Sequence, residues 1–142
     1  MAFNVLIVDD SSSMRSVIKK TIKVSGFDVG KYLEAADGRE AMRVLTSEWV
    51  DILLTDINMP NMNGLELIGE MKKDEVFKKI PVVMVTTERS EQKVHQAMEM
   101  GATGYITKPF LPEKIKETLS AIMGEAEYAK TELDEGYDGR DF

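Results

Sequence analysis

Short apolar runs alternate with segments of helical period along the first 124 residues of the chain. Strands are expected at 5–10, 32–37, 51–56, 81–86 and 104–108, and helices at about 12–25, 38–48, 64–73, 90–100 and 112–123. The runs 5–8 and 82–85 are apolar at every position, which is typical of parallel strands covered by helices on both faces. The pattern therefore predicts an α/β fold with a doubly wound, five-stranded parallel sheet.

Composition and charge divide the chain at residue 124. With 142 residues and 43% hydrophobic side chains, the chain has enough apolar material for one domain, which we assign to 1–124. Residues 125–142 carry a net charge of −5 out of the total of −7, so they form a distinct acidic extension. A net negative charge argues against a nucleic-acid surface.

Two further features bear on where the protein acts. No apolar run reaches the roughly 18 residues that a membrane-spanning helix needs. The chain contains no cysteine, which rules out disulfide bonds and fits the cytoplasm. We therefore expect a cytoplasmic protein that does not enter a membrane.

Acidic and basic side chains follow the strands of the predicted sheet. Asp9 and Asp10 end the first strand, Asp56 the third, Thr86 the fourth and Lys108 the fifth. Sheets of this class bind ligands at the carboxyl ends of their strands, where the strand order reverses. If the order is 2-1-3-4-5, the first and third strands are neighbours and the three carboxylates meet at one crevice.

Three carboxylates in one crevice repel one another unless a cation lies between them. Mg²⁺ suits such a site because it binds a few carboxylates and retains coordination positions for phosphate oxygens. Phosphoryl transfer needs mainly positioning and neutralisation of charge. Asp56 is accordingly the expected nucleophile, with Mg²⁺ on one side, the Lys108 ammonium on the other and the Thr86 hydroxyl as a donor.

These residues, together with the segments "TDINMPNMNGLEL" and "GATGYITKPF", resemble the receiver domain of two-component response regulators, and in particular the stand-alone chemotaxis regulators. The resemblance covers about 1–124 and implies the flavodoxin-like order 2-1-3-4-5. It also implies a cis bond between Lys108 and Pro109.

The resemblance assigns a role to each site residue. Asp56 is the phosphoacceptor, and Lys108 is the partner of the phosphoryl group. Thr86 and Tyr105 are the switch pair. Asn58 and Glu88 occupy positions that adjust autodephosphorylation. The metal ligands are Asp9, Asp10, Asp56 and the backbone carbonyl of Asn58.

The same resemblance implies partners. A histidine kinase would phosphorylate Asp56, and an output protein, expected to be the flagellar motor switch, would bind the surface of the fourth helix, fifth strand and fifth helix. A phosphatase is a further possible partner. The main alternative is a receiver that passes phosphate along a relay outside chemotaxis.

Two rival functions remain open from the residues alone. A haloacid-dehalogenase-type phosphatase also phosphorylates an aspartate at a strand end, but it uses a second acid two residues later, where this chain has Asn58. A receiver-like scaffold without phosphorylation would not need the complete set of acids, threonine and lysine found here.

The acidic extension has no counterpart in the family pattern. Apolar residues recur along it at spacings of four and three: Ile115, Leu119, Ile122, Ala126, Ala129 and Leu133. This repeat predicts that the last helix continues to about residue 133, with 137–142 mobile. The alternative is a disordered acidic tail throughout.

Overall fold

Five parallel strands form one sheet in the order β2-β1-β3-β4-β5, as the computed structural model of the chain shows. The structure describes residues 2–135, and the side chains of residues 2–124. The strands are β1 (Phe3–Val8), β2 (Val29–Ala35), β3 (Ile52–Thr55), β4 (Val82–Thr86) and β5 (Gly104–Thr107). The predicted strand order and fold class are therefore confirmed.

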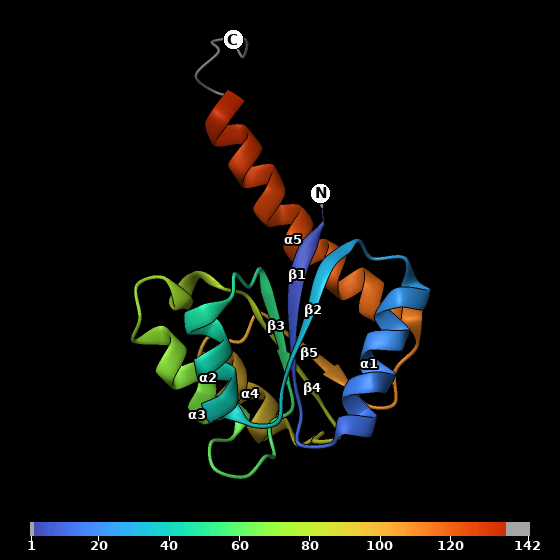
Figure 1. Cartoon of the computed structure of the whole chain (residues 1–142), viewed down its shortest axis with the longest axis vertical. Coiled ribbons are helices and arrows are strands. Elements are labelled where there is room, and N and C mark those ends of the chain that lie inside the picture. The colour runs from blue at the N-terminus through green and yellow to red at the C-terminus, as the bar shows by residue number, and fades with distance from the viewer. Residues whose placement is uncertain (1, 136–142) are drawn as a thin grey trace.

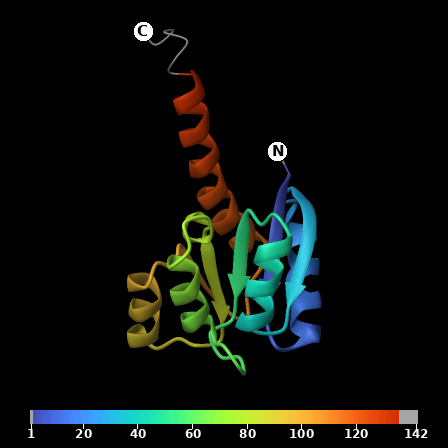
Figure 2. The same ribbon diagram turned by 60° about the vertical axis from the view of Figure 1, so that its left-hand side comes forward.

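Five helices cover the two faces of the sheet. They are α1 (Ser12–Ser25), α2 (Gly38–Ser47), α3 (Gly64–Lys72), α4 (Glu91–Glu99) and α5 (Pro112–Glu135), with a short 3-10 helix η1 (Phe77–Lys79) between α3 and β4. Figure 1 and Figure 2 show α1 and α5 on one face and α2, α3 and α4 on the other. Within the described residues, no helix combines the length and apolar character that a bilayer crossing demands.

Each face of the sheet contributes alternate strand residues to its own core. On β1, Leu6 and Val8 pack with α2, α3 and α4, while Val5 and Ile7 pack with α1 and α5. All four are at most 1% exposed. The continuous apolar runs arise because both faces of the sheet are covered by helices.

Three elements differ from the expectation. β1 covers Phe3–Val8 rather than 5–10, so Asp9 and Asp10 follow the strand instead of ending it. β2 begins at Val29 rather than residue 32 and ends at Ala35, because Asp37 leaves the sheet to cap α2 by accepting a hydrogen bond from the Glu40 backbone N–H at 2.8 Å. η1 was not predicted, because three residues are too short to show a helical period. The helix α5 ends at Glu135, and the expected mobility of 137–142 falls outside the described residues.

The loop after β3 folds back so that α3 begins directly against the end of that strand. Gly64 donates its backbone N–H to the Ile57 carbonyl at 2.8 Å. A Cβ atom on Gly64 would collide with the Asp56 carbonyl oxygen and would lie 3.0 Å from the Ile57 Cα. Only glycine fits here, because the neighbouring atoms belong to the backbone and cannot rotate away.

Replacing Gly64 with alanine should therefore lower the free energy of unfolding by about 3 kcal/mol, since the added methyl group forces β3 and α3 apart. Gly69→Ala is the matched control in the same helix. Its Cβ would meet only Met100 at 3.7 Å, and alanine should raise stability by up to about 1 kcal/mol. Urea unfolding of both variants measures the difference, and equal stabilities would contradict the close approach.

Candidate functional site

The register of β1 and β3 places two carboxylates side by side. Val8 is paired with Thr55, and the Asp56 backbone N–H donates to the Val8 carbonyl at 3.0 Å. Asp9 and Asp56, the next residues on the two strands, therefore leave the sheet at the same edge. Ligand oxygens of Asp9, Asp10 and Asp56 all lie within 4.8 Å of one another.

The side chain of Lys108 reaches this cluster from the end of β5. Its Nζ lies 2.9 Å from the Asp9 Oδ2 and 3.3 Å from the Asp56 Oδ2. Asp9 is 2% exposed and Lys108 9% exposed. A buried carboxylate needs such a partner, because removal from water strongly disfavours an isolated charge.

Backbone donors orient the other carboxylate oxygens. The Asp9 Oδ1 accepts a hydrogen bond from the Ser11 N–H at 2.9 Å, and the Asp56 Oδ1 accepts one from the Ile57 N–H at 2.6 Å. A longer contact of 3.4 Å joins the Asn58 N–H to the same Asp56 oxygen. Both carboxyl groups are thus held in defined orientations, while Asp10 is exposed to solvent.

Arg15 supports the site from α1, although no sequence pattern singled it out. Its Nη1 donates to the Asp9 carbonyl at 2.5 Å, and its Nε donates to Glu34 of β2 at 2.9 Å. Hydrogen bonds from the Lys19 side chain and, to a smaller extent, from Arg15 lower the pKa of the Glu34 carboxyl group. The only signal in the sequence was a basic residue in the first turn of α1. Acidic residues are more favourable there, because they interact with the positive end of the helix dipole.

A second group of residues joins β4 to β5 beside the acids. Thr86 is fully buried, and its Oγ1 accepts a hydrogen bond from the Glu88 N–H at 3.2 Å. The Tyr105 hydroxyl donates to the Glu88 carbonyl at 2.9 Å. The loop after β4 is therefore bonded to Thr86 on one side and to Tyr105 on the other.

The electrostatics of this loop keep Tyr105 neutral. Burial raises the pKa of the Tyr105 phenol above its usual value of 10.0, and the negative charges of Glu88 and Asp56 raise the pKa further. The phenol consequently remains a hydrogen-bond donor throughout the neutral pH range.

The loop that carries Asn58 packs against the start of α2. The Asn61 side chain donates to Asp37 at 2.7 Å, and this bond, after the stronger effect of the Glu40 N–H, lowers the pKa of Asp37. Asn58 itself is exposed. Its carbonyl as a metal ligand therefore stays a prediction.

The donor set fits a hard divalent cation. Three carboxylates and the Lys108 ammonium leave two negative charges, which a divalent ion balances, and every nearby ligand is an oxygen. The site can hold a metal beside an oriented carboxylate and a fixed ammonium, which is what attack on a phosphoryl group requires.

Comparisons with known proteins agree with this geometry. The family model described as "Response regulator receiver domain" matches residues 5–120. A chemotaxis protein CheY homolog of Campylobacter jejuni is 45% identical over 120 residues, which cover 84% of this chain and 91% of the relative. CheY1 of Helicobacter pylori is 43% identical over 120 residues, with 84% and 95% covered.

Solved structures give the same result. Chemotaxis protein CheY4 of Vibrio cholerae superposes with a TM-score of 0.76 at 36% identity, covering 85% of this chain and 98% of that protein. The Mn²⁺-bound form of the response regulator Rcp1 has a TM-score of 0.72 at 28% identity, covering 83% and 92%. With a matching domain model, close relatives and a sheet of the same order, the chain belongs to the response regulator receiver family, in its CheY chemotaxis branch.

Proposed function

We propose that the protein is a phosphorylation-dependent switch in which a histidine kinase transfers a phosphoryl group to Asp56. The observation that carries this proposal is that the Asp56 carboxylate lies close both to the other two carboxylates and to the Lys108 ammonium, which is 3.3 Å away. Receiver domains are signalling proteins rather than enzymes with a separate substrate. We expect this one to act in the cytoplasm, as the resemblance to response regulators implies.

In the proposed reaction an oxygen of the Asp56 carboxylate attacks phosphorus. The new P–O bond forms as the bond from phosphorus to the kinase histidine nitrogen breaks, and the product is an acyl phosphate. A bound Mg²⁺ would neutralise charge on the phosphoryl oxygens, held by Asp9, Asp10, Asp56 and the Asn58 carbonyl. The Mn²⁺-bound Rcp1 supports a divalent ion in a receiver of this fold.

The residues around Asp56 are expected to control the lifetime of the phosphoryl group. Lys108 would exchange part of its contact with Asp9 and Asp56 for a phosphoryl oxygen. Autodephosphorylation would return the aspartate by attack of water on phosphorus. The resemblance implies that the exposed Asn58 and the half-buried Glu88 adjust the rate of that attack. A separate phosphatase could accelerate the same hydrolysis.

The signal would reach a partner through the loop between β4 and α4. A phosphoryl oxygen accepting a hydrogen bond from the Thr86 hydroxyl would draw Oγ1 toward Asp56 and away from the Glu88 N–H, whose hydrogen bond it now accepts. Movement of the loop would release Tyr105 from the Glu88 carbonyl and change the surface of α4, β5 and α5. The curated chemotaxis relatives favour the flagellar motor switch as the protein bound there, and a phosphorelay outside chemotaxis is the alternative.

Asp56→Asn should abolish phosphorylation, because an amide is not a nucleophile and carries no charge for Lys108 or the metal. Incubation with acetyl phosphate and Mg²⁺, followed by mass spectrometry of the intact chain, should show one added phosphoryl group in the wild type and none in the variant. Asp51→Asn, near the opposite end of β3, is the matched control and should keep the adduct. An undiminished adduct in Asp56→Asn would refute the assignment.

Thr86→Ala should still accept phosphate but lose most of the response. We expect the gain in affinity for the motor-switch protein on adding beryllofluoride to fall by about fivefold or more, as is typical when coupling between sites is lost. Thr87→Ala, at the exposed neighbouring position, should respond like the wild type. Calorimetry or a labelled-partner titration measures both affinities. A full response in Thr86→Ala would contradict the proposal that Thr86 couples phosphorylation to partner binding.

A further inference from the structure

The Asp10 carboxylate is held differently from the other two acids of the candidate cation site. A backbone N–H donates to the carboxylate of Asp9 at 2.9 Å and another to that of Asp56 at 2.6 Å, and both carboxylates contact the Lys108 ammonium. Within residues 2–124, the exposed Asp10 carboxylate makes no hydrogen bond and no ion pair. Its position therefore depends on the backbone from which it projects.

The peptide group between Asp9 and Asp10 is held by the side chain of Arg15. The Arg15 Nη1 donates to the Asp9 carbonyl at 2.5 Å. Because a peptide group is planar, a hydrogen bond to this carbonyl also fixes the Asp10 N–H and limits the directions in which the Asp10 side chain can project. Arg15 can reach the carbonyl because helical side chains lean toward the N-terminus of their helix, here toward the end of β1.

Arg15 is in turn fixed by Glu34 of β2. The Arg15 Nε lies 2.9 Å from one oxygen of the Glu34 carboxylate, and the Lys19 ammonium lies 3.0 Å from the other. The Arg15 side chain is only 16% exposed, so it is packed against the protein. A guanidinium carries its donors in a rigid plane, and this one therefore links the Asp9 carbonyl to β2 in a defined geometry.

The charge of Arg15 by itself opposes the binding of a cation. A positive group near a divalent ion raises the free energy of the bound state. The ion pair with Glu34 offsets part of this repulsion. A favourable effect of Arg15 on the site must therefore come from the position that it gives to neighbouring groups.

We propose that Arg15 is a positioning residue for the cation site: it fixes the peptide between Asp9 and Asp10 and so directs the Asp10 carboxylate toward the other two acids. Glu34 holds Arg15 in place, and the edge strand β2 thereby supports a site to which it contributes no ligand. The inference rests on the proposed function only in requiring that the three acids bind a divalent ion.

Arg15→Met should weaken the binding of Mn²⁺ to the unphosphorylated protein about tenfold, the usual effect of losing a group that orients a metal ligand. If charge alone mattered, loss of the guanidinium would tighten binding, so the two explanations predict opposite signs. Lys19→Met is the matched control. It removes a cation from the same glutamate but leaves the bond to Asp9 intact, and the affinity should stay the same or rise slightly.

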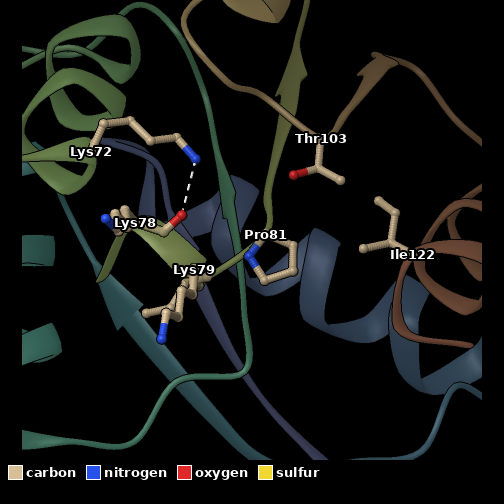
Figure 3. A pocket seen from close by; sticks show the side chains of 7 residues that line it. Lys72, Lys78, Lys79, Pro81, Thr103 and Ile122 are labelled. Atoms are coloured by element: carbon tan, nitrogen blue, oxygen red, sulfur yellow. Dashed lines mark hydrogen bonds between the residues drawn. The ribbon is translucent and has the colours of Figure 1, made fainter. Parts of the chain in front are cut away.

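A third variant, Lys79→Met, controls for the net charge of the protein. Lys79 lines a pocket beside Pro81, just before β4 begins and at the opposite edge of the sheet from Asp56 (Figure 3). This substitution changes the net charge as much as the other two and should leave Mn²⁺ affinity unchanged. Electron paramagnetic resonance of the free ion measures each dissociation constant, and urea unfolding establishes that all three variants are folded.

Nuclear magnetic resonance of the metal-free protein tests the positioning itself. The order parameter of the Asp10 amide should be about 0.85 in the wild type, as in rigid backbone, and should fall in Arg15→Met but not in Lys19→Met. Glu34→Ala should also lower it. Adding Glu34→Ala to Arg15→Met should have no further effect, because both residues act through one chain of hydrogen bonds.

Two results would overturn the proposal: an Asp10 amide as rigid in Arg15→Met as in the wild type, or Mn²⁺ binding that is unchanged or tighter in that variant. A wild-type protein that binds no Mn²⁺ would instead contradict the cation site on which the proposed function depends. The order parameters would then still show whether Arg15 fixes the peptide.

Discussion

The ammonium group of Lys108, held between Asp9 and Asp56, is the interaction on which the site depends. Asp9 is almost fully buried, and a buried carboxylate without a counter-charge would destabilise the end of β1. The ion pair forms because β5 lies in the same sheet as β1 and β3, so that a long side chain can cross the carboxyl edge. The site chemistry therefore depends on the strand order, because only this order brings the Lys108 ammonium to both carboxylates.

The same arrangement explains how phosphorylation of Asp56 could change a surface far from that residue. Asp56, Thr86 and Lys108 follow or end three strands whose register is set by backbone pairing, so they cannot shift independently. The loop after β4 is the softer part, since two hydrogen bonds, from Glu88 to Thr86 and from Tyr105 to Glu88, hold it in place. A charge added at Asp56 meets a rigid edge on one side and a movable loop on the other.

Most of the fold was predictable because it rests on burial, which leaves a periodic trace in the sequence. Continuous apolar runs such as Val82–Val85 indicated strands covered on both faces, and acids and lysine at successive strand ends indicated the crevice. Close approaches leave no such trace. From the sequence, Gly64 is an ordinary turn residue, and only the structure shows that the Asp56 carbonyl occupies the space that a Cβ would need. From the sequence, Arg15 is an ordinary surface residue, and only the structure shows its hydrogen bond to the Asp9 carbonyl.

Binding of Mg²⁺, measured by isothermal titration calorimetry with and without beryllofluoride, tests the central claim most directly. If Asp9, Asp10 and Asp56 form a cation site completed by a phosphoryl group, Mg²⁺ should bind weakly alone and markedly more tightly with beryllofluoride present. Asp9→Asn should abolish both effects, while Glu117→Gln, an exposed acid on α5, should preserve them. Equal Mg²⁺ affinity with and without beryllofluoride, or binding that survives in Asp9→Asn, would contradict the account.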